Sequence, residues 1–122
     1  MTRPEITGIR PLDFSRWIRQ RLPDSSTGFA VSDLDFIIWN WKTRDVMLIE
    51  TKTRNAEMKP AQRIMFELLA KWIAKGLDSD WTFHGFHFIK FENTWFHDGF
   101  VYLNGEVITE IELQEKLSNF EP

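Results

Sequence analysis

Two acidic residues and a lysine stand at the ends of two apolar segments, in a spacing that could bind a metal ion. The segment Val46-Met-Leu-Ile-Glu50-Thr-Lys52 runs from four apolar residues directly into Glu-x-Lys. Side chains two residues apart in a strand point to the same face, so Glu50 and Lys52 should lie together at the end of a buried strand. Upstream, Asp35 begins a second apolar run, Phe36-Ile-Ile-Trp39.

The two apolar runs are separated by a short polar segment, residues 40–45, which predicts a turn. We therefore expect strands at about 29–39 and 45–52, joined as an antiparallel hairpin. The open end of this hairpin would place the two acids and the lysine side by side. Such a group is typical of a metal-dependent phosphodiesterase site.

Phosphodiester hydrolysis requires neutralisation of the phosphate charge and activation of a water molecule. Mg²⁺ or Mn²⁺ does both and prefers oxygen ligands, which Asp35 and Glu50 would supply. Lys52 would orient or deprotonate the attacking water, or hold the phosphate. Asp33 shares the expected strand face and competes with Asp35, which we favour because it directly precedes the apolar run. The alternative to a catalytic site is that Glu50 and Lys52 form only a surface ion pair at the end of the strand.

The rest of the chain predicts one mixed α/β domain. Apolar spacing predicts helices over Pro11–Leu22 and from Pro60 to about Gly76. An aromatic strand is expected at Trp81–Phe91, another near Phe96–Leu103, and a hairpin turn at Asn104-Gly105 returning through Ile108. Thr109-Glu-Ile-Glu112 predicts a capping box that starts a helix to about Asn119. The order is α-β-β-α-β-β-β-α, a central mixed sheet flanked by helices.

This arrangement resembles the PD-(D/E)XK nuclease superfamily, with its restriction-endonuclease-like core. The matching residues are Asp35, Glu50 and Lys52, with Thr51 between the last two and Gln62 on the following helix. From its length we expect the chain to form one nuclease-like domain over residues 1–122, with a core at about 12–91 and a C-terminal hairpin and helix at about 94–119. The resemblance itself covers roughly residues 12–75. It also implies that the Thr51 carbonyl binds the metal and that Gln62 contacts the metal-bound water or the DNA backbone.

The resemblance extends to small phage nucleases, VRR-type nucleases and Holliday-junction resolvases. It implies a Mg²⁺- or Mn²⁺-dependent DNA endonuclease. Because the domain is small, we expect cutting directed by DNA structure, such as a junction, flap or single strand, in recombination, repair or phage genome processing. A homodimer and replication or recombination partner proteins would suit such an enzyme. The alternatives are a non-catalytic DNA-binding or assembly module on the same scaffold, and an enzyme that cleaves RNA.

The distribution of charge along the chain bears on the choice between these functions. The formal charge of the 122-residue chain is −3, but basic residues concentrate in segments 1–21 and 52–75 and acidic residues after position 98. A cationic half around Glu-x-Lys would suit a phosphate backbone, and three basic residues are candidate DNA contacts: Arg54, Lys59 and Arg63. The same residues could equally form a solvated helix face.

Several classes of site and location are disfavoured by the sequence. The chain has no cysteine, which excludes disulfides and thiolate chemistry. His84 and His87 are three apart in an expected strand, so they should face opposite sides and not share an ion. No apolar run is long enough to span a bilayer and no signal peptide is evident, so we expect a cytoplasmic protein without membrane contact.

Overall fold

The computed structural model describes residues 13–28 and 30–121, and the chain separates into two compact units, Met1–Val31 and Ser32–Pro122. Within the described residues, no helix is long and apolar enough to cross a membrane. The expectation of a single nuclease-like domain over residues 1–122 stays a prediction.

Among its described residues, the first unit contains one α-helix and one short 3-10 helix. Helix α1 spans Asp13–Arg21, as the apolar spacing predicted, and Pro11 and Leu12 lie outside the described residues. Its rings Phe14 and Trp17 stack at a centroid distance of 5.6 Å. The 3-10 helix η1, Ser25–Thr27, follows in the expected loop, where the Asp24 carboxylate accepts the Ser26 N–H at 3.0 Å.

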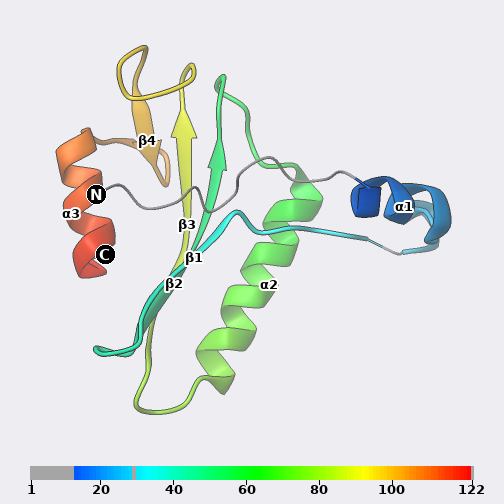
Figure 1. Ribbon diagram of the computed structural model, residues 1–122, viewed down its shortest axis with the longest axis horizontal. Coiled ribbons are helices and arrows are strands. Elements are labelled where there is room, and N and C mark those ends of the chain that lie inside the picture. Colours follow the sequence, from blue (N-terminus) through cyan, green and yellow to red (C-terminus); the bar gives the residue numbers. More distant parts are fainter. Residues whose placement is uncertain (1–12, 29, 122) are drawn as a thin grey trace. The chain divides into compact units, whose positions relative to one another are not determined.

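The second unit is a five-stranded mixed sheet with a helix on each face (Figure 1). The strands are adjacent in chain order, and only β2 and β3 are parallel. This confirms the predicted α/β class, and the order of helices and strands agrees with the prediction. The elements are β1 Phe36–Asn40, β2 Asp45–Lys52, α2 Pro60–Gly76, β3 Thr82–Phe91, β4 Val101–Leu103, β5 Glu106–Val107 and α3 Glu110–Asn119.

Alternate side chains of β3 enter two separate apolar clusters, one on each face of the sheet, and β2 contributes to the larger one. The larger cluster packs β2 and β3 against α3 through Met47, Ile49, Ile89, Phe91, Leu113 and Phe120. The smaller cluster, Met58, Phe66 and Phe88, lies on the α2 side, where Phe66 stacks on Phe86 at 4.9 Å. Glu50 and Lys52 alternate with Ile49 and therefore face α2.

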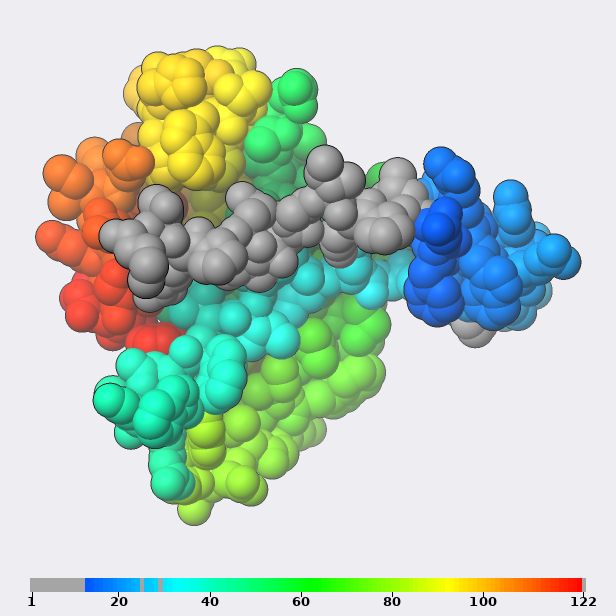
Figure 2. All heavy atoms as spheres, in the orientation of Figure 1, coloured from blue at the N-terminus to red at the C-terminus, as the bar shows by residue number. Residues whose placement is uncertain are grey.

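The outer surface of α2 is uncovered in the space-filling view, below the segment that leads into β1 (Figure 2). Large apolar side chains one helical turn apart are exposed on this helix, at Ile64, Leu68 and Trp72. The apolar spacing of the sequence places them on one side of the helix, together with Leu69 and Ile73. Within the described residues, the side chain of α2 that is fully buried is Phe66.

The hairpin of β1 and β2 is antiparallel as predicted, with Phe36 opposite Ile49 and Asn40 opposite Asp45. The prediction of a strand from residue 29 was wrong, because β1 begins only at Phe36 and residues 30–35 form no strand. The reason is local. The Asp35 carboxylate accepts the Thr51 N–H at 2.9 Å, so a side chain occupies the place of the next ladder partner.

The predicted strand near Phe96–Leu103 is also shorter than expected, because β4 contains only Val101–Leu103. The preceding residues form a loop organised by the Asp98 carboxylate. This group accepts the backbone N–H of Thr94 at 3.1 Å and that of Trp95 at 2.9 Å. These bonds close a turn and remove the residues from the sheet. The hydrogen bond from the Thr94 hydroxyl, followed by those from the backbone N–H groups, holds the pKa of Asp98 down at about 2.

The two histidines of β3 do not face opposite sides as predicted. The register between β2 and β3 shifts between Val46 and Leu48, opposite Gly85, whose φ is +88°. The extra residue lies in β3 and places His84 on the same face of the sheet as His87. His84 packs on Phe120 of the α3 cluster and its Nε2 lies 2.7 Å from Asp45 Oδ1, so both histidines act as sheet residues.

The turn and cap of the C-terminal region follow the prediction. Asn104 and Gly105 both have positive φ, 53° and 88°, as a two-residue turn requires. At the start of α3, the Thr109 hydroxyl accepts the Glu112 N–H at 3.1 Å, and the Glu112 carboxylate accepts the Thr109 N–H at 3.2 Å.

The capping box should contribute measurably to stability. Thr109→Ala removes the acceptor of one otherwise unpaired N–H, so we expect the free energy of unfolding to fall by about 1 kcal/mol in urea titrations. Ser118→Ala, an exposed change in the last turn of the same helix, is the control and should stay within about 0.5 kcal/mol. Equal stability of the two variants would contradict a capping role for Thr109.

Candidate functional site

The carboxylates of Asp35 and Glu50 meet at the open end of the hairpin, as the sequence predicted. The Asp35 backbone N–H donates to Glu50 Oε1 at 3.3 Å. Asp35 Oδ2 accepts both the N–H and the hydroxyl of Thr51, each at 2.9 Å. Thr51 therefore fixes the Asp35 side chain beside the strand that carries Glu50.

Glu50 is the one charged or polar side chain that is buried within the described part of the chain, with 2% of its surface exposed. Burial is the largest cause that raises the pKa of Glu50 to about 7, and the hydrogen bond with the Asp35 side chain and the charge of Asp35 act in the same direction. The charge of Lys52 opposes this effect. The site thus holds one carboxyl group whose ionisation is disfavoured until a compensating charge is present.

The donor atoms of this site fit a hard divalent cation. Asp35 and Glu50 offer carboxylate oxygens, and Mg²⁺ commonly takes one or two carboxylates while keeping several water ligands. Among the described residues, no group of three or more His, Cys, Asp or Glu side chains is placed to hold a metal. A metal here would therefore use the two carboxylates with water and backbone oxygen, and the role of the Thr51 carbonyl stays a prediction.

Asp33 and Asp35, which the sequence left in competition, occupy different surroundings. Asp35 lies beside Glu50 and is fixed by Thr51. Asp33 is exposed and lies before the first residue of β1, and within the described residues it makes no hydrogen bond to Glu50. The geometry therefore favours Asp35 as the acidic partner of Glu50.

Lys52 has a neighbour that sequence reasoning missed. Because β2 and β3 are parallel, Lys52 pairs with Lys90, and Glu50 pairs with Phe88. The Lys90 amine contacts Glu57 Oε1 at 2.5 Å, and its side chain is 18% exposed. The signal in the sequence was a single lysine near the end of the apolar strand His87-Phe-Ile-Lys-Phe91, but only the register between strands places it beside Lys52.

Gln62 has a structural role in the geometry observed. Its Oε1 accepts the Lys59 N–H at 3.2 Å and so caps the start of α2. Within the described residues, no hydrogen bond joins Gln62 to Asp35, Glu50 or Lys52. A contact of Gln62 with a metal-bound water stays a prediction.

The predicted DNA-contacting residues Arg54, Lys59 and Arg63 lie after β2 and in the first turn of α2, and all three are exposed. Arg54 has a φ of +54°, and its N–H donates to Asn93 O at 2.6 Å, which ties this loop to the loop after β3. In the part of the chain that the structure describes, none of the three forms an ion pair with a carboxylate.

Comparison of the chain with protein-family models, with curated proteins and with solved structures found no match. The resemblance to the PD-(D/E)XK nucleases therefore rests on Asp35, Glu50, Lys52 and their placement on the hairpin.

The buried Glu50 should give stability a specific pH dependence. The unfolded chain ionises Glu50 near 4.5 and the folded chain near a pKa of about 7, so the folded state binds more protons between these values. The free energy of unfolding should therefore fall as the pH rises through this range, by on the order of 2 kcal/mol relative to Glu50→Gln.

Urea unfolding in EDTA from about pH 4 to about pH 8 measures this difference. Glu67→Gln, an exposed change on α2, is the matched control, and its curve should run parallel to that of the wild type. Parallel curves for the wild type and Glu50→Gln would contradict a raised pKa at Glu50.

Proposed function

We propose that this protein is a Mg²⁺- or Mn²⁺-dependent nuclease that hydrolyses phosphodiester bonds in DNA. The observation that carries the proposal is the burial of Glu50 against Asp35 near the end of β2, two positions before Lys52 on the same strand. A buried carboxylate beside a second carboxylate is costly unless a cation is present, and such arrangements concentrate at functional sites.

Each residue of the site has a distinct task in this proposal. Asp35 and Glu50 hold the ion, with Thr51 fixing Asp35. The bound ion supplies a Lewis acid that polarises the phosphate and lowers the pKa of a bound water. Lys52 orients or deprotonates the attacking water, or holds the phosphate charge. Exposed cations bind the flanking phosphates, at Arg54, Lys59 and Arg63.

The small scaffold suggests how the substrate is selected. The described residues of the second unit form one sheet and two helices. They include no further helix or strand that could read a base sequence. We therefore expect cutting to follow DNA structure, at a junction, flap or single strand, in recombination, repair or phage genome processing. A homodimer would provide one site for each strand of a duplex, and replication or recombination proteins would supply further specificity.

Metal binding should stabilise the folded protein. A ligand that binds only the folded state adds about 1.4 kcal/mol at ten times its Kd, so Mg²⁺ or Mn²⁺ should raise Tm by several degrees. Glu50→Gln and Asp35→Asn should each abolish the rise in differential scanning fluorimetry. Glu115→Gln, which changes an exposed carboxylate on α3, should keep it. No rise with either ion at millimolar concentration would count against a metal site.

Cleavage should depend on both the metal and Lys52. The substrates are duplex, single-stranded, flap and four-way-junction DNA, each with Mg²⁺, Mn²⁺ or EDTA. EDTA should abolish cutting, and Lys52→Ala should slow it by about 10²–10⁴-fold, as loss of a group that moves a proton or positions the water does. Lys71→Ala removes an exposed amine from α2 and should cut as the wild type does.

The same assay separates the enzyme from the non-catalytic alternative. Wild-type protein that binds these DNAs but cuts none of them would favour a DNA-binding or assembly module on the same scaffold. Equal cutting of an RNA strand of the same sequence would instead favour an RNA-cleaving enzyme.

A further inference from the structure

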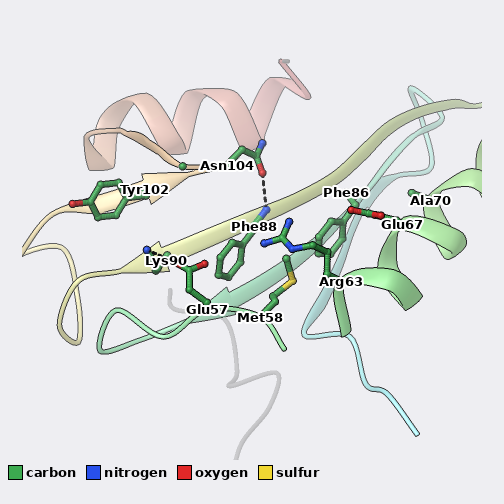
Figure 3. A pocket seen from close by; sticks show the side chains of 11 residues that line it. Glu57, Met58, Arg63, Glu67, Ala70, Phe86, Phe88, Lys90, Tyr102 and Asn104 are labelled. Atoms are coloured by element: carbon green, nitrogen blue, oxygen red, sulfur yellow. Dashed lines mark hydrogen bonds and ion pairs between the residues drawn. The ribbon is translucent and has the colours of Figure 1, made fainter. Parts of the chain in front are cut away.

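A cavity of about 520 Å³ lies beside the candidate site, bounded by the loop after β2, by α2 and by strands β3 and β4 (Figure 3). It exists because α2 covers β3 but not β4, which leaves the α2 side of the outer sheet open. Its lining includes two basic and two acidic residues and three aromatic rings: Arg63, Lys90, Glu57, Glu67, Phe86, Phe88 and Tyr102. Its volume falls in the range of small-ligand sites, ~300–1,000 Å³.

The floor of the cavity is apolar and firmly packed. Phe88 is buried, and Phe86 is held by its stacking on the buried ring of Phe66 at 4.9 Å. The sulfur-bearing side chain of Met58 packs with the same group. Ring faces fixed in this way form a surface on which a planar, apolar-faced group can lie.

The wall of the cavity carries charge. The Lys90 amine contacts Glu57 and lies 5.3 Å above the centroid of the Tyr102 ring, so two neighbours fix its position. Arg63 projects toward the cavity from the first turn of α2, in the view of Figure 3, and is exposed. Within the described residues it forms no ion pair with a carboxylate, so its charge is open to an anion.

The cavity adjoins the carboxylate pair through the sheet register. Phe88 is the neighbour of Glu50 and Lys90 is the neighbour of Lys52 on the parallel strands β2 and β3. Adjacent strands are ~4.8 Å apart, and paired side chains point to the same face. A ligand in the cavity would therefore lie within about one nucleotide of a phosphate held at Asp35 and Glu50.

We propose that this cavity binds one unpaired deoxynucleotide next to the scissile phosphate. The base lies on the Phe86 and Phe88 floor beside Tyr102, and the phosphate is bound by Arg63 and Lys90. A base paired within a duplex cannot enter, so the substrate is DNA with an unpaired nucleotide at the cut, as in a single strand or flap. This inference rests on the proposed function, because it names the substrate class of the same site.

The test is calorimetric binding of single deoxynucleotides in EDTA, where no cleavage can occur. The probes are the four deoxynucleoside 5′-monophosphates, the deoxynucleosides without phosphate, and inorganic phosphate. We expect the monophosphates to bind in the submillimolar range, and the nucleosides and inorganic phosphate to bind at least about tenfold more weakly. Binding of phosphate alone with equal affinity would overturn the proposal.

The variants separate the cavity from the rest of the surface. Tyr102→Leu and Arg63→Ala should each weaken monophosphate binding by about tenfold, and Arg63 is exposed, so its replacement does not threaten the fold. Trp72→Leu and Lys71→Ala change an aromatic and a basic residue on α2 outside the cavity, and they should bind as the wild type does. Equal weakening by the control variants would overturn the proposal.

The cleavage assay distinguishes this inference from the proposed function. If the wild type cuts paired duplex and flap equally and binds no monophosphate, the cavity proposal fails while the nuclease stands. If the wild type binds monophosphates through Arg63 and Tyr102 but cuts no DNA, the cavity is a nucleotide site and the nuclease proposal fails. If Tyr102→Leu raises KM for the flap more than for the duplex, both proposals are supported.

Discussion

The carboxylate of Asp35 is the interaction on which the candidate site depends. By accepting the N–H and hydroxyl of Thr51, it ends the β1–β2 ladder and turns the chain away before β1 can extend. The same contact holds a negative charge against the buried Glu50, whose pKa rises to about 7. One side chain therefore sets the length of a strand and adds to the effect of burial on the pKa of Glu50, and a cation between the two carboxylates would relieve their repulsion.

The parallel pairing of β2 and β3 decides what surrounds these acids. Parallel strands end at the same edge, so the loops that follow them are neighbours, and Asn55 N–H donates to Phe91 O at 3.0 Å. This edge gathers the basic loop after β2, the start of α2 and the Lys90 side chain. The two faces of the sheet differ in their packing. On one face α3 covers a fully apolar cluster, whereas the face that carries α2 has a cavity with charged walls.

Prediction from the sequence succeeded where one local rule acted alone. Helix α2 begins at Pro60 and α3 at the Thr109 cap, and the turn at Asn104 has the backbone conformation that its residues favour. It failed where side chains replaced main-chain partners. The strands expected before Phe36 and before Val101 do not form there. The Asp35 carboxylate accepts the Thr51 N–H, the Asp98 carboxylate accepts the Thr94 N–H, and strand pairing ends at these points.

The sequence by itself determined the class of fold, the order of elements and the meeting of Asp35 with Glu50, because a hairpin with a short polar turn fixes its own register. Only the tertiary structure decided that Lys90 stands beside Lys52, that a bulge at Gly85 turns both histidines to one face, and that a cavity opens beyond α2. These features depend on the pairing of β2 with β3, which are separated in the chain by the whole of α2. The local sequence of either strand does not determine which residues of the two strands lie opposite each other.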